Sequence, residues 1–564
     1  MAILRRKKQE NKPLEFESFS ELLIGLKVSC GNKTAFRFKE KNGTRDITYA
    51  EFCHDVFSLR QSLELLGIAK CHIACVADNS YEWINTYFTV LCSSGVFVPI
   101  DTEIYRTDIT DQIIHSGCSV VFYSREYEYI FRDNEEKLSN VKYFIGIDRN
   151  EDDGKFLSFE KLRIRGELEK FRNTAENSIK RSENEPAMLI YTSGTTGESK
   201  GVLLSEKNLI SCIHYGLELS GGFNISLSLP PYYNSYQAIC CILGNVASGA
   251  ALCTNDNVKN FFNDLRLYHP DTVFLVPSYT ELIYKRMVSD FKKNHISQVI
   301  NGAIRVGNIV KKSGINIRKV SFELIHSRLG GNLKRIICGG APLSPEAGDF
   351  FEGIGIPIYN GYGITECTGL ISLNTKKLNN HRTVGVPLSC LDIIIKDPDE
   401  DGNGEIAVKG DTVMTGYYKN EELTAKAFDE NGYFLTGDYG HFDDKERIVI
   451  TGRKNYVIVL PNGKNIYPEE IESCIRRIPY VEETVVYARK NKKGREIALI
   501  AEVYLGSEIT NGFDFSSYTQ RVAHDVAKVC KKLPVYKQVS DVVVRAQDFP
   551  KTATNKIKRN KVGF

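Results

Sequence analysis

The residues best suited to do chemistry form a loop of small and hydroxylated side chains between two apolar runs. Residues 187–204 read AMLIYTSGTTGESKGVLL, so the loop at 192–197 follows one apolar run and precedes Lys200 and a second run. Glycines let such a loop approach a ligand closely, and its hydroxyl and N–H groups supply donors without a competing negative charge. Two flanking strands favour a polyphosphate-binding loop over the alternative of a flexible surface turn. The candidate phosphate ligands are Thr192, Ser193, Gly194, Thr195, Thr196, Gly197 and Lys200.

The loop departs from the GxxxxGK[ST] phosphate-binding pattern, because Ser199 precedes Lys200 and Gly201 follows it. The stretch YTSGTTGESKG instead resembles the signature loop of the adenylate-forming superfamily, which includes acyl-CoA synthetases, firefly-type luciferases and the adenylation domains of peptide synthetases. Ser199 replaces the proline that is usual before the lysine, and we expect a slightly more mobile loop with unchanged chemistry. The resemblance implies that the chain uses ATP to activate a carboxylic acid as an acyl-AMP.

Residues 359–366, YNGYGITE, are similar to the superfamily segment that contacts adenine, the α-phosphate and Mg²⁺. By that resemblance Tyr362 stacks on adenine, Thr365 contacts the α-phosphate, and Glu366 holds Mg²⁺ together with Thr192. The chemistry agrees, since a carboxylate beside phosphates is a usual way to hold Mg²⁺. Taken alone, the segment also fits a glycine-rich turn with a surface acid.

Further segments resemble those that hold ribose and adenine in the superfamily. Residues 433–438, YFLTGD, and residues 451–471, TGRKNYVIVLPNGKNIYPEEI, supply an aspartate and an arginine for the ribose hydroxyls, which are Asp438 and Arg453 here. Without the resemblance they would be interpreted as a turn aspartate and a surface ion-pair arginine. The candidate walls beside adenine and the acyl group come from RIICGGAPLSPE and are Gly339, Gly340 and Ala341. Gly363, which follows Tyr362, is a further candidate nucleotide-binding residue because an aromatic between two glycines can lie flat against a base.

The C-terminal stretch KTATNKIKR resembles the segment whose lysine bridges the carboxylate and the α-phosphate, so Lys556 joins Thr365 and Glu366 in the predicted catalytic set. Asn555 stands where glycine is usual. The alternative is a solvated basic tail, and the matched order of all these motifs along the chain favours the catalytic role.

The resemblance also implies a second half-reaction with CoA. In the superfamily the small domain turns about a hinge residue and brings a glycine-containing loop toward the CoA thiol. Here the hinge position is Asn455, where Asp or Lys is usual, and the candidate CoA-binding residues are Gly463 and Lys464. Asn tolerates unusual backbone angles, so we expect an altered but working hinge.

Tyr233, in LPPYYNSYQ, occupies the position where amino-acid-activating members place an aspartate, and it offers no charge to an α-ammonium group. The stretch 277–339 resembles the insertion of long-chain fatty acyl-CoA synthetases, the group to which the chain is most similar. We therefore expect conversion of a medium- or long-chain fatty acid, with ATP and Mg²⁺, to acyl-AMP and then, with CoA, to acyl-CoA. Two alternatives stay open: an adenylation enzyme that loads an acyl or aminoacyl group onto carrier-protein phosphopantetheine, and a non-catalytic nucleotide-binding relative. The second would be expected to lack Glu366 or Lys556.

Composition fits a multidomain enzyme. The 564 residues exceed the size of one core, and 73 basic against 70 acidic residues predict no field that binds nucleic acid. Ten histidines and 15 cysteines form no HExxH or CxxC pattern, so we expect no metal cage. Many cysteines without a secretory signal, and apolar stretches too short for a span, predict a cytoplasmic protein with at most peripheral membrane contact.

An α/β scaffold must position these residues. A helical pattern at 205–219 opens with Ser205 as N-cap, and a turn rich in Asp and Gly at 391–410 predicts the hairpin of a small β subdomain. Helical patterns alternate with strand-like runs, which argues for mostly parallel sheets. These runs lie at 72–77, 96–100, 119–124 and 272–277.

We therefore predict an AMP-binding N-terminal domain at 1–454 and a small, mobile α+β domain at 455–564 that carries the catalytic lysine. The smaller domain is expected to contain helices at 468–477 and 516–532 and strands in ETVVYA, IALIAEVYL and VSDVVVR.

Overall fold

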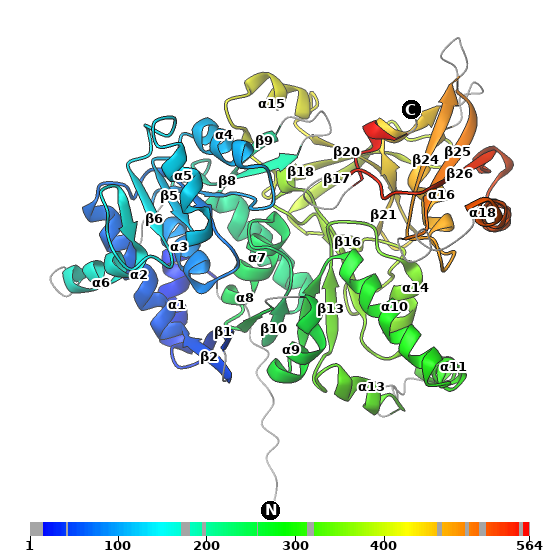
Figure 1. Cartoon of the computed structure of the whole chain (residues 1–564), viewed down its shortest axis with the longest axis horizontal. Coiled ribbons are helices and arrows are strands. Elements are labelled where there is room, and N and C mark those ends of the chain that lie inside the picture. The colour runs from blue at the N-terminus through cyan, green and yellow to red at the C-terminus, as the bar shows by residue number, and fades with distance from the viewer. Residues whose placement is uncertain are drawn as a thin grey trace, which may run out of the picture. The chain divides into compact units, whose positions relative to one another are not determined.

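The computed structural model describes residues 15–40, 43–170, 181–193, 199–255, 258–312, 321–459, 465–490, 496–506, 515–551 and 557–562. The chain forms two compact units, and Figure 1 shows their elements. The larger unit comprises Met1–Asp392 and Lys409–Gly432, and the smaller comprises Ile393–Val408 and Tyr433–Phe564. A functional boundary after residue 454 stays a prediction.

An eight-stranded sheet builds one part of the larger unit, and its middle strands are parallel. Nearly all side chains of β3, β4 and β5 are buried, as expected for parallel strands covered on both faces. The connecting helices are α3 (Tyr81–Leu91), α4 (Arg106–Ser116), α5 (Glu128–Asp133) and α6 (Phe159–Lys170). The strands, in spatial order, are β19 (Gly416–Tyr417), β9 (Ser199–Ser205), β8 (Pro186–Ser193), β4 (Val96–Pro99), β3 (His72–Val76), β5 (Val120–Tyr123), β6 (Tyr143–Gly146) and β7 (Phe156–Ser158).

A nine-stranded sheet forms the other part, with six successive parallel strands from β14 to β1. Its order is β16 (Val386–Pro387), β15 (Ser372–Leu373), β14 (Ile358–Tyr362), β13 (Arg335–Cys338), β12 (Thr272–Leu275), β10 (Ile225–Ser228), β11 (Ala251–Thr254), β1 (Thr34–Glu40) and β2 (Gly43–Thr48). The four strands predicted between residues 72 and 277 are thus confirmed as β3, β4, β5 and β12.

Helices of the larger unit fill the crossovers between these strands. Ser205 caps α7 (Glu206–Ser220) as predicted, because its side chain accepts a hydrogen bond from the Asn208 amide. The stretch after Tyr233 forms a π-helix, η2 (Tyr236–Leu243), and such helices are rare and frequent at functional sites. The other helices are α1 (Phe19–Cys30), α2 (Tyr49–Leu65), α8 (Gly244–Ala247), α9 (Phe261–Tyr268), α10 (Pro277–Lys293), α11 (Ser297–Lys312), α13 (Glu323–Arg328), α14 (Pro345–Gly353) and α15 (Glu421–Ala427).

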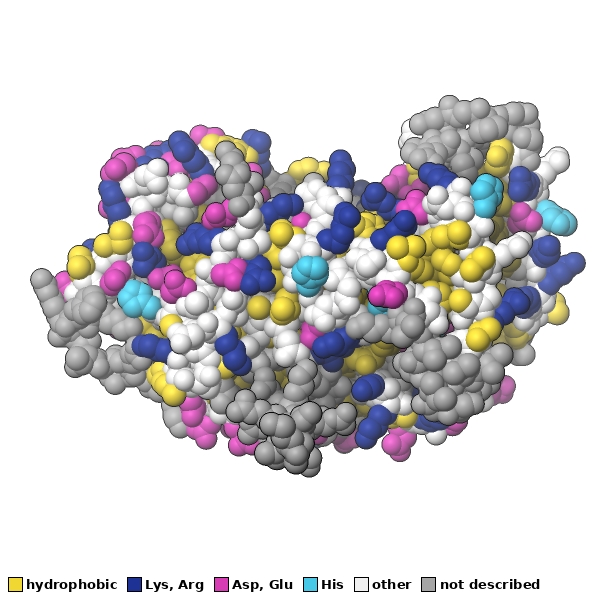
Figure 2. All heavy atoms as spheres, turned by 90° about the horizontal axis from the view of Figure 1, so that it is seen from below, with side chains coloured by type: hydrophobic (Ala, Val, Ile, Leu, Met, Phe, Trp, Pro, Cys, Tyr) yellow, Lys and Arg dark blue, Asp and Glu magenta, His cyan; other side chains and the backbone are white. Residues whose placement is uncertain are grey.

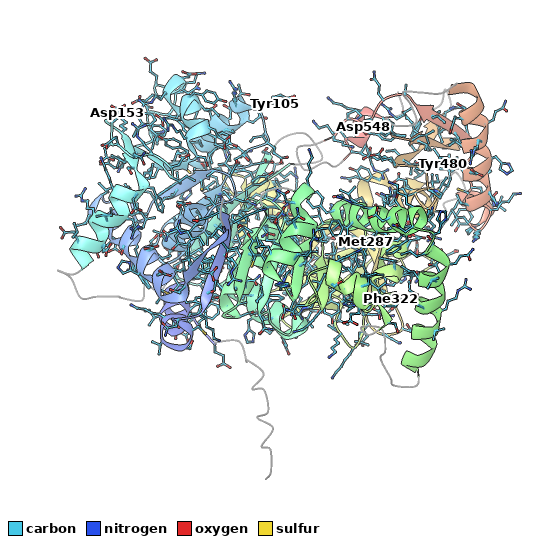
Figure 3. The ribbon with its side chains drawn as sticks, turned by 60° about the horizontal axis from the view of Figure 1, so that its bottom comes forward. Tyr105, Asp153, Met287, Phe322, Tyr480 and Asp548 are labelled. Atoms are coloured by element: carbon cyan, nitrogen blue, oxygen red, sulfur yellow. The ribbon has the colours of Figure 1, made fainter. Side chains whose placement is uncertain are left out.

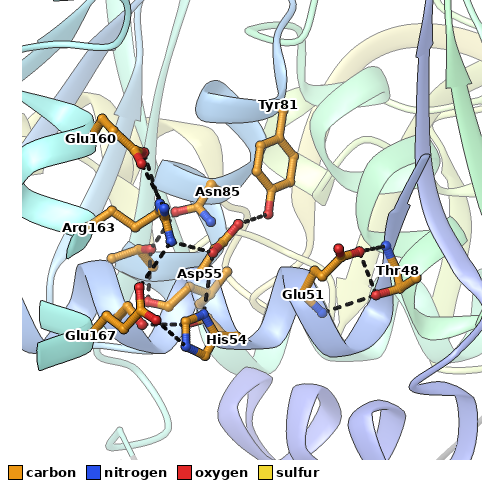
Figure 4. A network of polar contacts seen from close by, with 12 residues as sticks. Thr48, Glu51, His54, Asp55, Tyr81, Asn85, Glu160, Arg163 and Glu167 are labelled. Carbon is orange, nitrogen blue, oxygen red and sulfur yellow. Dashed lines mark hydrogen bonds and ion pairs between the residues drawn. The ribbon is translucent and has the colours of Figure 1, made fainter. Parts of the chain in front are cut away.

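A polar network ties α2, α3 and α6 together at the edge of the larger unit (Figure 4). Arg163 on α6 lies 3.0 Å from Asp55 on α2, and Asp55 accepts a 2.8 Å hydrogen bond from the Tyr81 hydroxyl on α3. A capping box of Thr48 and Glu51 starts α2 in the same network. The network fixes helix positions and contains none of the predicted site residues.

The smaller unit carries most of the hairpin predicted at 391–410, which is confirmed as β17 (Leu391–Lys396) and β18 (Gly404–Gly410) beside β20 (Phe434–Phe442) and β21 (Ile448–Arg453). The helices and strands predicted beyond residue 467 are also confirmed. They are α16 (Pro468–Ile475) and α18 (Phe515–Cys530), packed on a sheet of β24 (Glu483–Lys490), β25 (Glu496–Tyr504) and β26 (Asp541–Arg545). A short ribbon of β22 (Ile458–Val459) and β23 (Asn465–Ile466) precedes them.

The surface carries charged side chains of both signs, as expected from the near-equal numbers of basic and acidic residues. Lys and Arg side chains are interspersed with Asp and Glu side chains on the face shown in Figure 2. No helix within the described residues is both long and apolar enough to cross a bilayer. Most cysteines are buried, as small hydrophobic core residues, and the described residues contain no cluster of three or more metal-binding side chains.

Candidate active site

Strands β8 and β9 form an antiparallel hairpin that frames the predicted phosphate loop. Thr192 faces Lys200 and Ser193 faces Ser199 across the hairpin. The Thr192 hydroxyl donates to the Lys200 carbonyl oxygen at 3.5 Å. The structure therefore brings Thr192 and Lys200 together at the end of the hairpin that adjoins the connecting loop. The predicted ligands Gly194, Thr195, Thr196 and Gly197, and the side chain of Ser193, lie outside the described residues.

Lys200 and Glu366 meet at one tyrosine that sequence analysis missed. Tyr417 donates its hydroxyl to Glu366 Oε1 at 2.9 Å, and Lys200 Nζ lies 5.6 Å from the centre of the Tyr417 ring. Tyr417 reaches this position because β19 pairs with β9, with Tyr417 opposite Val202. Burial, together with the negative charge of Glu366, raises the pKa of Tyr417, so the hydroxyl stays a neutral donor. A candidate phosphate-binding lysine and a candidate metal-binding carboxylate thus lie around one aromatic ring.

The turn after β14 is closed so tightly that it requires glycine. A Cβ added to Gly363 would lie 2.1 Å from the Gly369 carbonyl oxygen. The turn folds back through a 2.7 Å hydrogen bond from the Ile371 amide to the Tyr362 carbonyl oxygen. Thr365 contacts Ser235, with 3.1 Å between the two hydroxyl oxygens. The structure thus groups Tyr362, Gly363, Thr365 and Glu366 on one compact turn, and adds Ser235 from the loop before the π-helix.

The glycine-rich turn after β13 presents backbone rather than side chains. A Cβ on Gly339 would lie 3.6 Å from the Tyr236 ring, whereas Gly340 has φ +90° and open space around it. Gly340 and Ala341 are both exposed. Tyr236 is held by a 3.0 Å hydrogen bond from its hydroxyl to the Ile337 carbonyl oxygen. This arrangement suits a wall against which a flat group can lie, as predicted for adenine.

Tyr233 lies close to carboxyl groups of other segments. Sequence analysis considered only the missing aspartate at position 233, and the structure corrects this step. Its hydroxyl is hydrogen-bonded to Asp101, just after β4, and Glu103 lies next to that carboxylate. Burial, with the charges of Asp101 and Glu103, raises the pKa of Tyr233. Burial also raises the pKa of Asp101, while hydrogen bonds from the Glu103 amide and from Tyr233 oppose the rise. The absence of a carboxylate at position 233 therefore does not leave this region without negative charge.

The smaller unit brings the two predicted ribose ligands together. Asp438 on β20 faces Arg453 on β21, and Arg453 Nε lies 2.7 Å from Asp438 Oδ1. Asp438 is 5% exposed and Arg453 is 43% exposed. A buried carboxylate held by a half-exposed guanidinium suits an acceptor for two vicinal hydroxyls. Asn455, the predicted hinge, follows in the short 3₁₀ helix η5 (Lys454–Tyr456), and Gly463, Lys464 and Lys556 lie outside the described residues.

Comparison with known proteins decides the family. The AMP-binding enzyme model matches residues 27–418, and the AMP-binding enzyme C-terminal domain model matches residues 455–563. The chain belongs to the AMP-binding enzyme family. It is therefore an adenylate-forming acid–CoA ligase family member, as the motifs predicted.

Relatives within the family are distant. The long-chain-fatty-acid–CoA ligase FadD15 of Mycobacterium bovis is 26% identical over 539 residues, which cover 90% of this chain and 86% of the relative. The chloroplastic long-chain-fatty-acid–[acyl-carrier-protein] ligase AEE15 of Arabidopsis thaliana is 24% identical over 525 residues, which cover 79% of this chain and 71% of the relative. The anthranilate CoA ligase AuaEII in complex with anthranoyl-AMP has a TM-score of 0.76 at 17% identity, over 98% of each chain. This structural likeness confirms the predicted α/β fold, with a large N-terminal domain of parallel sheets and a smaller C-terminal domain.

Proposed function

We propose that this family member converts a medium- or long-chain fatty acid into its CoA thioester in two steps, through an enzyme-bound acyl-AMP. The contact of Lys200 and Glu366 with Tyr417, beside the hairpin that frames residues 194–198, carries the proposal. It combines a cation for terminal phosphates with a carboxylate for a metal ion. The long-chain ligases among the distant relatives support the acyl class.

In the first step, an oxygen of the fatty acid carboxylate attacks the α-phosphorus of ATP, and the bond to pyrophosphate breaks. Lys200 and the loop hold the β- and γ-phosphates, Thr365 contacts the α-phosphate, and Tyr362 stacks on adenine. Lys556 stabilises the pentacovalent transition state through a positioned charge. Acyl-AMP and pyrophosphate are the products.

Glu366 is suited to hold Mg²⁺ in this step. Its Oε1 accepts a hydrogen bond from Tyr417, whereas Oε2 has no hydrogen-bond partner among the described residues. A carboxylate with one fixed and one available oxygen fits an oxygen-binding divalent ion, and we assign the Thr192 hydroxyl as a second ligand. Bound Mg²⁺ would supply positive charge to the phosphate oxygens.

In the second step, the CoA sulfur attacks the acyl carbon, the thiol proton is lost, and AMP leaves. We assign Asp438 and Arg453 to the ribose in both steps. The small domain turns about Asn455, which withdraws Lys556 and brings Gly463 and Lys464 to the pantetheine chain. Adenylation and thioester formation would thus use different residues of the same domain.

A screen of pyrophosphate release tests both the acid and the acceptor. Carboxylates from acetate to long fatty acids, and amino acids, are compared with and without CoA. Rates that rise with chain length and a CoA-dependent thioester support the proposal. Acyl-AMP formation with transfer only to a carrier protein would support the second candidate, which the similarity to the acyl-carrier-protein ligase AEE15 favours. A cytoplasmic location stays a prediction.

A further inference from the structure

The two chain ends that flank residues 552–556 are held side by side. Lys551 and Ile557 form an antiparallel bridge. The Lys558 amide donates to the Pro550 carbonyl oxygen at 2.7 Å. Since Ile557 follows Lys556 in the chain, whatever fixes this bridge also fixes one end of the segment that carries the predicted catalytic lysine.

One side of the bridge is anchored by two carboxyl groups. Lys551 Nζ lies 2.8 Å from Glu483 Oε1, at the start of β24, and 2.9 Å from Asp548 Oδ2, which Figure 3 labels. The Glu483 and Lys551 side chains are only 23% and 21% exposed. Ile557 packs against the apolar cluster that contains Phe549. The ammonium group is therefore held in a partly dehydrated setting, where its charge interactions are stronger than at the open surface.

The Glu483 and Asp548 carboxyl groups also lie close to one another, because both contact the Lys551 ammonium group. Glu483 Oε2 is buried and has no hydrogen-bond partner in the described part of the chain. A proton between the two carboxyl groups would give it a bond to Asp548, and such a bond contributes to the pKa shifts of both groups. Two ionised carboxylates cannot donate to each other, so one of them must be protonated for this bond. Burial raises the pKa of Glu483 to about 7, the bond to Asp548 adds to the rise, and Lys551 opposes it. Burial acts to raise the pKa of Asp548, but hydrogen bonds from Glu483 and Lys551 lower it. The shared proton is therefore assigned to Glu483.

Other titratable and charged groups also face this triad. Tyr504 faces Glu483 across the register of β24 and β25, and Glu482 precedes it. Arg545 is paired with Glu502 on β25 and donates to the Asp548 carbonyl oxygen. None of these neighbours replaces Lys551 as the cation between the two carboxyl groups.

Arg559, which follows the bridge at Ile557, is a second anchor, and its charge does not change near neutral pH. Arg559 is paired with the buried Glu472, lies 3.8 Å from Glu469, and its guanidinium carbon is 4.8 Å from the centre of the Tyr456 ring. An arginine stays protonated throughout the physiological range. Burial raises the pKa of Glu469, and Arg559 opposes this rise. The Arg559 guanidinium therefore provides a comparison in which the cation itself does not titrate.

We propose that Glu483, Asp548 and Lys551 are positioning residues that share one proton and thereby fix the segment carrying Lys556, so that loss of this proton slows adenylation. The proposal rests on the proposed role of Lys556. With the proton, the triad is neutral and all three groups are bonded. Without it, two carboxylates compete for one ammonium group and repel each other, and the bridge to Ile557 loosens.

Glu483→Gln tests this directly, because an amide donates to Asp548 at every pH. Pyrophosphate exchange is measured for the wild type and the variant at about pH 6 and about pH 8.5, on either side of the Glu483 transition. The ratio of variant to wild-type rate should rise about two- to fivefold between the two pH values, the size expected for a partly exposed charge interaction. Asp541→Asn, which removes an exposed acid of the same sheet, should give a ratio that does not change with pH. Glu472→Gln should lower the rate by the same factor at both pH values.

Hydrogen exchange of the Lys558 amide gives a second reading that does not need activity. Residues 557–562 have the same sequence, and therefore the same intrinsic exchange rates, in the wild type and in Glu483→Gln. The ratio of the protection factors of the two proteins therefore reports only the effect of the Glu483 anchor. The wild type should lose protection relative to Glu483→Gln at about pH 8.5 and match it at about pH 6. If protection changes in this way but the wild type catalyses no pyrophosphate exchange, the anchor is upheld and the proposed function is overturned. A protection ratio that is independent of pH, or a rate ratio that is flat for Glu483→Gln in an active enzyme, would overturn the anchor.

Discussion

Glu366→Gln should lower the rate of adenylation by about a hundredfold or more, because removal of one preorganised charge-stabilising group typically has an effect of that size. The structure makes this a clean substitution. Tyr417 donates to Glu366 Oε1 at 2.9 Å, and the amide oxygen of glutamine can accept the same bond. The variant therefore removes the negative charge while it keeps the packing of the turn.

Tyr417→Phe is the matched control. It removes the hydrogen bond but keeps both the charge of Glu366 and the ring below Lys200. We expect a loss of about tenfold, about 1.4 kcal/mol, which is near the lower end of the range for a hydrogen bond to a charged acceptor and is below the loss for Glu366→Gln.

Pyrophosphate exchange measured over a range of Mg²⁺ concentrations separates the two effects. Glu366→Gln should shift the Mg²⁺ dependence to higher concentration, whereas Tyr417→Phe should lower the maximal rate with little shift. Exchange at the wild-type rate in Glu366→Gln, or the same Mg²⁺ dependence in all three proteins, would refute the assignment of Glu366 to the metal ion.

Three further outcomes are expected. Gly363→Ala should destabilise the larger unit by about 1–3 kcal/mol in thermal unfolding, because its Cβ would lie 2.1 Å from a backbone oxygen. Gly302→Ala is the control and should be neutral or stabilising, because Gly302 has open space around it on an exposed helix. Equal melting temperatures for the two variants would contradict the tight turn. Arg453→Gln should raise KM for ATP about tenfold or more, and it should also lower the melting temperature, because it removes the cation that faces the buried Asp438 carboxylate. An unchanged KM would remove Arg453 from the ribose site. Fatty acids should exceed acetate in kcat/KM, with each buried methylene favouring binding by up to about 0.8 kcal/mol; a best substrate with an α-amino group would show that Asp101, beside Tyr233, serves a cation.

The scaffold was predictable wherever local pattern and burial agree. β3, β4 and β5 are short, almost wholly buried runs, and α7 begins at a serine that caps it. Asp438 and Arg453 were predicted from two motifs to act together, and their strands place them opposite each other.

The missed contacts all depend on pairing between distant segments. Tyr417 lies 51 residues from Glu366 and reaches it only because β19 pairs with β9. Asp101 reaches Tyr233 from a loop of the other large sheet. The residue type at position 233 alone therefore did not predict the carboxyl group of Asp101 beside it. The π-helix at Tyr236–Leu243 has an apolar pattern that an α-helix would share, so the pattern alone does not identify it.

The central claim is that the chain activates an acid in two half-reactions that use different residues of its small domain. Measuring each half-reaction on Lys556→Ala tests it most directly, with Lys558→Ala as a control that removes a neighbouring charge of the same segment. The account predicts that Lys556→Ala abolishes acyl-AMP formation but still converts supplied acyl-AMP and CoA to thioester, and that Lys558→Ala changes neither step greatly, because a solvated charge contributes little. Equal, small effects of both variants, or equal losses of Lys556→Ala in both half-reactions, would contradict the account.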